Sequence, residues 1–353
     1  MSSSRLPALD IARGMAALAV VLFHYTCLNE TAREDLPGLA RFTVYGYLGV
    51  HLFFLISGYV IFMTLERTKN SIDFLFARAS RLYPSFLLSI ALTILCIYLL
   101  TDNIPFSMRD IALNMTMFPD ILGAKMVNPA YWTLGIEVVF YGIIFLAIII
   151  AGKKGITPIV LGWFALSVFN SFVGLGIAEK LLILKWAPLF TGGAALYLAT
   201  RETHWRRTAY LALFLITLPV AAHYTLLAFI EQKSRFSFWQ SDDITVVFVL
   251  AALYVVMGLI AFRPSGMSWM PSKFVELCGG GSYIIYLIHE RVGNILITKL
   301  YPSFGATSIV LVIATMVVAS SFIYMYFDKP AQKKLRAFRQ QLLTTSRAIP
   351  VKA

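Results

Sequence analysis

The sequence predicts an all-α, polytopic membrane protein with about ten transmembrane helices and both termini in the cytoplasm. Its 353 residues are 59% apolar and only 14% charged, so one soluble core cannot bury the apolar surface. Apolar stretches of about 20 residues, each long enough to cross a hydrocarbon layer of ~30 Å, recur from end to end. Lys and Arg residues also concentrate in alternate connecting segments, as the positive-inside rule requires.

The first apolar stretch carries Asp10 and Arg13 and lacks a small-residue cleavage site, so we expect it to remain as a helix. No linker, low-complexity tract or internal repeat interrupts the sequence, which predicts one membrane domain over residues 1–332. A basic amphipathic tail, 333–353, follows, and we expect it to be solvated or to lie on the lipid surface. The ten stretches cover residues 7–27, 46–66, 82–100, 132–151, 157–177, 186–200, 208–230, 244–262, 274–299 and 305–327.

The net charge of +12 is explained by this topology. No basic residues interleave with exposed aromatics on a soluble module, so we expect no nucleic-acid partner. The longest outer loop, 101–131, contains a segment over 108–118 that is either an interfacial helix or an ordinary loop packed on the bundle.

Three cysteines, Cys27, Cys96 and Cys278, show neither a disulfide framework nor metal-ligand spacing. We interpret each as a packing residue, with a Cys27–Cys96 bridge as the less favoured alternative. A metal site built from His24, His51 and Glu137 is likewise less favoured, and we expect no metal cofactor.

Ionisable side chains inside a bilayer cost roughly 3 kcal/mol each, so those that are retained there are candidates for function. Arg13 and His24 are eleven residues apart in the first stretch. On a helix this spacing is three turns plus about 20°, which puts both side chains on one face, ~16 Å apart. Asp10, one turn before Arg13, can lower the cost of burying that charge.

Three further groups, His51, Glu137 and His289, are predicted at about the same outer depth as His24. A lone membrane histidine usually makes an interhelical hydrogen bond. Imidazoles grouped with a carboxylate instead suit proton abstraction from a hydroxyl, because imidazole titrates near neutrality and a carboxylate stabilises its cation. We expect His24 to be the base, with either Glu137 or His51 orienting it.

At the inner side, Arg78 and Arg81 stand one helical turn apart just before the third stretch. Such a pair can bind phosphates from the cytosol, although a positive-inside loop needs arginines in any case.

Several segments resemble the acyltransferase-3 family of membrane acyltransferases, and the similarity runs from about Leu6 to Pro330 in the expected order. The matching segments are LPALDIARGMAALAVVLFHY, GYLGVHLFFLISGYVIF, FLFARASRLYP, NPAYWTLGIEVVFY, GSYIIYLIHE and the DKP that begins at Asp328.

The resemblance implies a ten-helix enzyme of the bacterial inner membrane that O-acetylates, or otherwise acylates, a surface polysaccharide, peptidoglycan or lipid-linked sugar. It also implies acyl-CoA as the donor, most often acetyl-CoA. Two positions depart from the family pattern: His51 stands where many relatives have Asp, and Asp328 where most have Glu. The family's functional positions fall on Arg13, His24, Arg78, Arg81, Glu137, Ser282, Tyr283 and His289.

The expected mechanism follows from these positions. Acyl-CoA enters from the cytosol and its thioester arm extends past Arg13 to His24, which takes a proton from the acceptor hydroxyl. Ser282 or Tyr283 would hydrogen-bond substrate or donor, and a covalent acyl-enzyme on Ser282 is less favoured than a packing role. We expect a stand-alone form without an extracytoplasmic hydrolase-like domain. The alternative function is a proton-coupled transporter or flippase of lipid-linked sugars.

Overall fold

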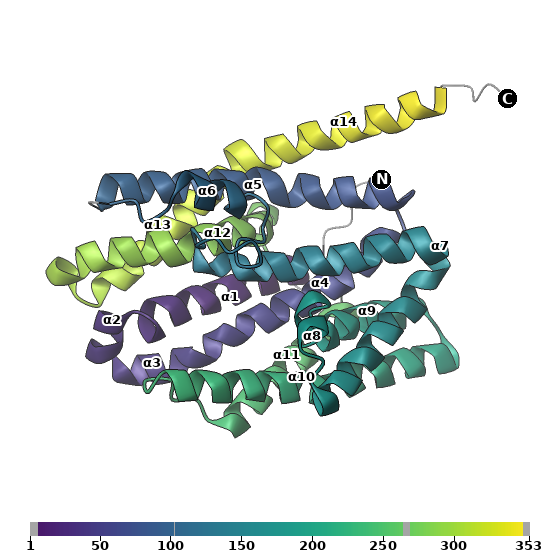
Figure 1. Cartoon of the computed structure of the whole chain (residues 1–353), viewed down its shortest axis with the longest axis horizontal. Coiled ribbons are helices and arrows are strands. Elements are labelled where there is room, and N and C mark those ends of the chain that lie inside the picture. The colour runs from purple at the N-terminus through teal and green to yellow at the C-terminus, as the bar shows by residue number, and fades with distance from the viewer. Residues whose placement is uncertain (1–5, 102, 264–268, 349–353) are drawn as a thin grey trace.

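The computed structural model describes residues 6–101, 103–263 and 269–348, and every regular element in these residues is a helix. Most of the helices run along the long axis of a single bundle (Figure 1). The α-helices are α1 Pro7–Leu22, α2 Glu30–Asp35, α3 Pro37–Thr43, α4 Gly49–Leu65, α5 Ser71–Leu100, α6 Met108–Asn114, α7 Trp132–Val173, α8 Ile177–Leu181, α9 Ala187–Arg201, α10 His204–Arg235, α11 Asp243–Phe262, α12 Ser272–Phe304, α13 Thr307–Ile323 and α14 Lys329–Ala348. Two short π-helices, η1 Phe23–Cys27 and η4 Tyr324–Asp328, and two 3-10 helices, η2 Val44–Leu48 and η3 Pro129–Tyr131, complete them.

The predicted all-helical fold is confirmed, and each of the ten apolar stretches lies largely within a helix. Two of the stretches share α7, which is broken at Gly152 by backbone angles (φ 63°, ψ −172°) that favour glycine. In the described part of the chain, seven helical segments are long and apolar enough to cross a membrane. Since α9 has only 15 residues and α12 carries several charges, ten crossings and cytoplasmic termini remain predictions.

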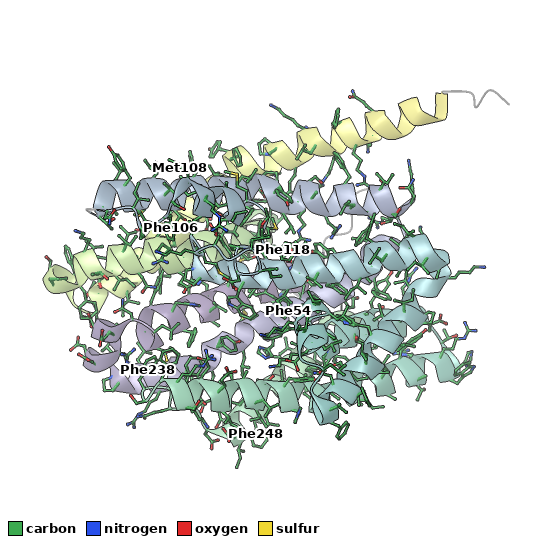
Figure 2. The ribbon with its side chains drawn as sticks, viewed as in Figure 1. Phe54, Phe106, Met108, Phe118, Phe238 and Phe248 are labelled. Atoms are coloured by element: carbon green, nitrogen blue, oxygen red, sulfur yellow. The ribbon has the colours of Figure 1, made fainter. Side chains whose placement is uncertain are left out.

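The outside of the bundle is apolar. Phe172 is 84% exposed and Phe248 is 69% exposed, and Figure 2 shows Phe248 at the surface. Exposing such side chains to water costs about 25 cal/mol per Å², whereas contact with lipid tails avoids that cost. The apolar helices and this apolar surface identify a multi-pass membrane protein.

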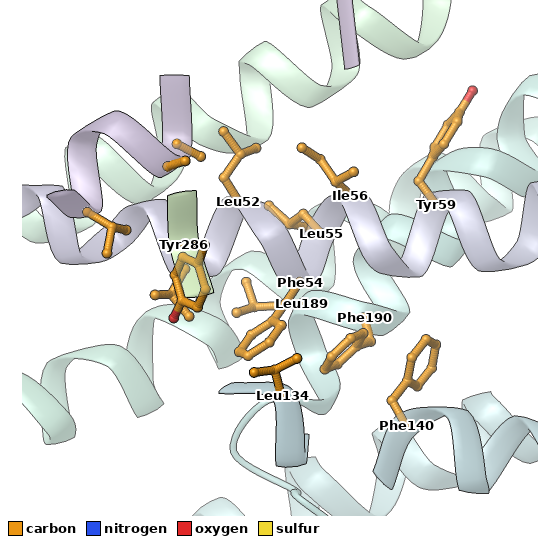
Figure 3. Close-up of a cluster of buried hydrophobic side chains, with 14 of the residues drawn as sticks. Leu52, Phe54, Leu55, Ile56, Tyr59, Leu134, Phe140, Leu189, Phe190 and Tyr286 are labelled. Atoms are coloured by element: carbon orange, nitrogen blue, oxygen red, sulfur yellow. The ribbon is translucent and has the colours of Figure 1, made fainter. Parts of the chain in front are cut away.

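The centre of the bundle is an aromatic cluster where α4, α7 and α9 meet. Phe190 lies between Phe54 and Phe140, with ring centroids 4.9 Å and 4.2 Å away (Figure 3). Small residues bring α4 and α9 into backbone contact, since a Cβ on Gly58 would lie 2.1 Å from the carbonyl oxygen of Phe190. Close packing through small residues is how helices associate where no hydrophobic force drives them together.

Helix α5 begins about three turns earlier than the apolar stretch suggests. Its first turn is capped by the side chain of Asn70, which accepts a hydrogen bond from the backbone N–H of Asp73. Arg78 and Arg81 therefore lie within the helix and not in a loop before it. A hydropathy pattern does not locate this start, because Asp73, Arg78 and Arg81 interrupt the apolar residues in the first turns of α5.

The loop over 101–131 packs on the bundle and contains the short helix α6, which ends before the predicted limit of 118. Asn114 is fully buried and donates a hydrogen bond to the carbonyl oxygen of Lys125, and Asn128 donates to that of Leu287 at 2.8 Å. At the surface, hydrogen bonds from Ser107 hold the pKa of Asp110 below its usual range. The hydrogen bonds of these buried amides hold the segment before α7 against α12 and within the loop.

The three cysteines, Cys27, Cys96 and Cys278, are unpaired, in line with the packing interpretation.

Replacing Gly193 with Ala should lower the thermal unfolding midpoint of the purified protein by several degrees. The added Cβ would lie 2.0 Å from the backbone oxygen of Leu55, and overpacking of this kind costs about 1–3 kcal/mol. Gly162→Ala is the matched control, because its Cβ would meet nothing within 4 Å. Equal midpoints for the two variants would contradict the close α4–α9 contact.

Candidate active site

A cationic pocket of about 440 Å³ lies among α1, α4, α5, α12 and α14. Its carboxylates are those of Asp10, Glu276 and Asp328, so guanidinium groups outnumber them two to one. An excess of arginine in a concave site favours a ligand with several negative charges. We call it the inner pocket, and its arginines are Arg13, Arg67, Arg78, Arg81, Arg336 and Arg339.

Arg78 is the least satisfied of these arginines. It is buried, and its Nε and Nη1 have no hydrogen-bond partner. The guanidinium lies 5.9 Å from the ring centroid of Tyr141 and 6.0 Å from that of Phe74, so its nearest described support is aromatic. Two buried guanidinium nitrogens without hydrogen-bond partners are costly, which favours an anionic ligand at this site.

A smaller middle pocket of about 60 Å³ shares Arg13, Arg81 and Tyr283 with the inner pocket. Glu137 also lines it, and accepts hydrogen bonds from Ser57 at 2.9 Å and from Tyr141. The structure thus places Glu137 in the same pocket wall as Arg13 and Arg81, and not at the level of His24 where the sequence predicts it.

Glu137 lies more than one helical turn into α7, which begins at Trp132. Asn128, just before the helix, is bonded to the backbone of α12. Thr133, which donates a hydrogen bond to Tyr286 at 3.0 Å, lies one helical turn before Glu137 in α7. Glu137 is therefore not beside His24.

His51 is buried at a different place. Its Nε2 lies 2.9 Å from the hydroxyl of Thr225, and its ring packs on Tyr47 and Trp186. Neither of the two partners predicted for His24 is its neighbour, and the three side chains of the alternative metal site do not form a cluster.

His24 lies in η1, one turn of π-helix that extends α1. Such turns widen a helix and are frequent at functional sites. The Nδ1 of His24 is 2.8 Å from the carbonyl oxygen of Val20. Since a carbonyl only accepts, this contact assigns the hydrogen of the neutral ring to Nδ1 and leaves a lone pair on Nε2.

His289 is in contact with His24, as the predicted cluster requires. Its Nε2 lies 3.3 Å from Nδ1 of His24, and its own Nδ1 lies 2.8 Å from the carbonyl oxygen of Tyr286. Tyr25 donates to the backbone oxygen of His289 at 2.9 Å, which fixes α1 against α12 at this level. The contact between Nδ1 of His24 and Nε2 of His289 therefore holds the two imidazole rings together.

Glu290 is the neighbour of His24 that sequence reasoning missed. Its Oε2 is 3.6 Å from Nε2 of His24 and, although buried, has no hydrogen-bond partner. Its position at the end of the segment GSYIIYLIHE was the available signal. Consecutive residues of a helix point about 100° apart, so the sequence does not show that both His289 and Glu290 reach the site.

Glu290 also lines an outer pocket of about 270 Å³. This outer pocket combines one carboxylate, two cations and several neutral hydrogen-bonding groups, which is a suitable lining for a polar ligand. Its residues are Thr101, Pro129, Glu290, Arg291, Asn294, Ile295, Thr298 and Lys299.

Ser282 and Tyr283 line the middle pocket from α12, but their hydroxyls are engaged. Ser282 donates to the carbonyl oxygen of Gly279 at 2.8 Å, and Tyr283 donates to that of Leu82 at 3.0 Å. Asp328, in the second π-helix, is buried and accepts hydrogen bonds from Ser85 and Gln332. It lines the inner pocket and is separate from the histidine pair.

The chain is similar in sequence to known acyltransferases. A family model described as an acyltransferase domain matches residues 6–326, which include every candidate position except Asp328. A protein of Shigella phage Sf6, described as "O-acetyl transferase", is 30% identical over 176 residues, or 46% of this chain and 52% of the phage protein. The match thus spans about half the length of each protein. No solved structure matches. Because the family model covers nine-tenths of the chain, the protein belongs to this family of acyltransferases.

Proposed function

We propose that the protein is a membrane-bound O-acyltransferase that moves an acetyl group from cytosolic acetyl-CoA to a hydroxyl of an extracytoplasmic or lipid-linked glycan. The observation that carries the proposal is the order of the three sites along the bundle. The inner pocket contains the unpaired Arg78, the middle pocket shares Arg13 and Arg81 with it, and Nε2 of His24 lies beside Glu290 of the outer pocket. The family and the phage relative support the type of reaction.

The donor fits the inner and middle pockets. CoA is a polyanion that ends in a thin, uncharged pantetheine arm. The phosphates would bind Arg78 and Arg81, since charge-assisted hydrogen bonds to arginine are strong and directional. The middle pocket, at about 60 Å³, is too small for a nucleotide but extends from Arg81 to Tyr286, whose ring lies 5.5 Å from that of His289. Arg13 would steady the arm where the two pockets join.

The chemistry assigned to His24 is general base catalysis. Its Nε2 accepts the proton of the acceptor hydroxyl while the hydroxyl oxygen forms a bond to the thioester carbonyl carbon. The carbon–sulfur bond then breaks, and the leaving thiolate takes that proton from His24, which gives an ester and free CoA. Glu290, 3.6 Å from Nε2, stabilises the imidazolium between the two proton transfers. His289 holds the ring through Nδ1.

The acceptor would approach from the side opposite to the donor. With the N-terminus in the cytoplasm, as the positive-inside pattern predicts, the outer pocket opens to the extracytoplasmic side of a bacterial inner membrane. Its amide, hydroxyl and charged groups suit the hydrogen-bonding hydroxyls of a sugar.

A proton-coupled transporter of lipid-linked sugars is the second candidate. The contact series His289, His24, Glu290 favours it, because neighbouring titratable groups inside a membrane also serve as proton relays. The two functions differ in whether a labelled acyl group travels from CoA to the sugar.

Replacing His24 with Ala should reduce acyl transfer by about 10²- to 10⁴-fold, because the base is lost. The assay follows radiolabelled acetyl groups from acetyl-CoA to membrane glycans at equal protein abundance. His223→Ala is the matched control, since His223 is an exposed histidine of α10 remote from the pockets. Near-normal transfer by His24→Ala would rule out its role as base.

Replacing Glu290 with Gln should lower the turnover number by about tenfold or more and leave the apparent KM for acetyl-CoA unchanged. Glutamine keeps the size of the side chain but cannot stabilise the imidazolium electrostatically. The same labelling assay, run across acetyl-CoA concentrations, separates the two constants. A rise in that KM without a fall in turnover would place Glu290 at the donor instead.

Replacing Arg78 and Arg81 with Gln should raise the apparent KM for acetyl-CoA by about tenfold or more, because charge-assisted phosphate contacts are lost. The acceptor requirement should change little. Replacing Lys153 and Lys154, two exposed lysines at the predicted cytoplasmic turn of α7, removes the same charge outside the pocket. If both double variants behave alike, the inner pocket is not the donor site.

A further inference from the structure

Helix α14 forms one wall of the inner pocket, and it lies beyond residue 326, where the family match ends. Gln332, Arg336 and Arg339 follow one another at intervals of four and three residues, which places them on one face of the helix. All three line the inner pocket. In Figure 1, α14 is the yellow helix that lies along α5. The start of the predicted surface tail, as far as Arg339, therefore lies against the inner pocket.

The helix is attached at both sides of Arg336. Arg339 donates from Nε and Nη2 to Oδ1 of Asp73 on α5, with both distances 2.6 Å, and the Asp73 side chain is fully buried. Toward the start of the helix, Gln332 donates to Asp328 at 2.7 Å, and Asp328 in turn accepts a hydrogen bond from Ser85 of α5. These two attachments fix the position and the rotation of the turn between them.

Arg336 itself is exposed and makes one hydrogen bond among the described residues, to Oε1 of Gln332 at 3.0 Å. Its other N–H groups are free to bind a ligand in the pocket. Arg67, at the end of α4, is also exposed and lines the same pocket. The pocket thus has exposed arginines in addition to the buried Arg78.

This difference in depth corresponds to the two kinds of phosphate in CoA. The diphosphate joins the pantetheine arm, whereas the 3′-phosphate sits on the ribose at the far end of the molecule. Arg81 is shared with the middle pocket that would hold the arm, and Arg78, one turn before it on α5, is buried, so both lie toward the diphosphate. Arg336 lines the inner pocket and is exposed, so it lies toward the ribose end. A terminal monophosphate is a dianion with three acceptor oxygens, which a guanidinium binds in a bidentate manner.

We infer that α14 is a phosphate clamp: Arg336, held in place by the Arg339–Asp73 ion pair, binds the 3′-phosphate of CoA and makes the protein select CoA thioesters over donors without this phosphate. The inference rests on the proposed donor site. It adds a recognition element that the Arg78 and Arg81 pair does not supply.

The test compares binding of CoA and of 3′-dephospho-CoA to the full-length protein in lipid nanodiscs by calorimetry. The wild-type protein should bind CoA more tightly by about tenfold or more, the typical value of a charge-assisted phosphate contact. Arg336→Gln should reduce this ratio to about one by weakening CoA alone. Lys334→Gln, an exposed residue of α14 that does not line the pocket, removes the same charge and should keep the ratio.

A second variant tests the attachment of the helix. Asp73→Asn leaves Arg336 intact but removes the charge that holds Arg339, so the ratio should again fall, whereas dephospho-CoA should bind as before.

Three results would overturn the clamp. They are equal binding of the two ligands by the wild type, an unchanged ratio in Arg336→Gln, and an equal loss of both ligands in that variant. In each of these cases CoA still binds the wild type, so the donor site itself would stand. Failure of the wild type to bind either ligand would overturn the donor site together with the clamp.

Discussion

The functional groups of this chain depend on how closely α1 packs against α12. Glycines on α12 make the approach close enough: a Cβ on Gly279 would lie 2.2 Å from Oδ1 of Asp10, and one on Gly293 would lie 1.8 Å from the hydroxyl of Tyr25. These two contacts fix the register of the helices near both ends of their shared surface. With that register, His24 meets His289, and Arg13 shares a pocket wall with Tyr283. Small residues that admit a polar partner are therefore as important here as the polar residues themselves.

Much of the fold could be predicted from the sequence, because a bilayer admits few structures. Backbone groups in lipid must be satisfied within each segment, so apolar stretches become helices wherever they occur. The face shared by Arg13 and His24 stays a prediction, since it rests on α-helical geometry and His24 lies in the π-helix η1. Arg78 and Arg81 were predicted to act together, and they share the inner pocket, although α5 begins before them.

Features that depend on contacts between distant segments could not be predicted. The partners of the buried amides before α7 lie on α12 and within the loop itself, and Glu137 accepts a hydrogen bond from Ser57, 80 residues away. The position of His51 depends on Thr225, 174 residues away. Glu290 meets His24 from α12, and nothing in the local composition distinguishes the π-helix that holds His24 from ordinary helix. The Arg339–Asp73 ion pair of α14 joins segments that are far apart in the sequence.

The middle pocket is narrow, at about 60 Å³, whereas the inner and outer pockets measure about 440 and 270 Å³. A cell membrane holds a potential, worth about 2.3 kcal/mol per elementary charge for each 100 mV, and an open aqueous path between its two sides would dissipate it. Liquid water occupies ~30 Å³ per molecule, so this constriction has room for only a few molecules. Arg13 and Arg81 line it and repel cations by their like charge. A pocket of this size, lined by two arginines, therefore leaves little room for a cation to pass the middle of the bundle.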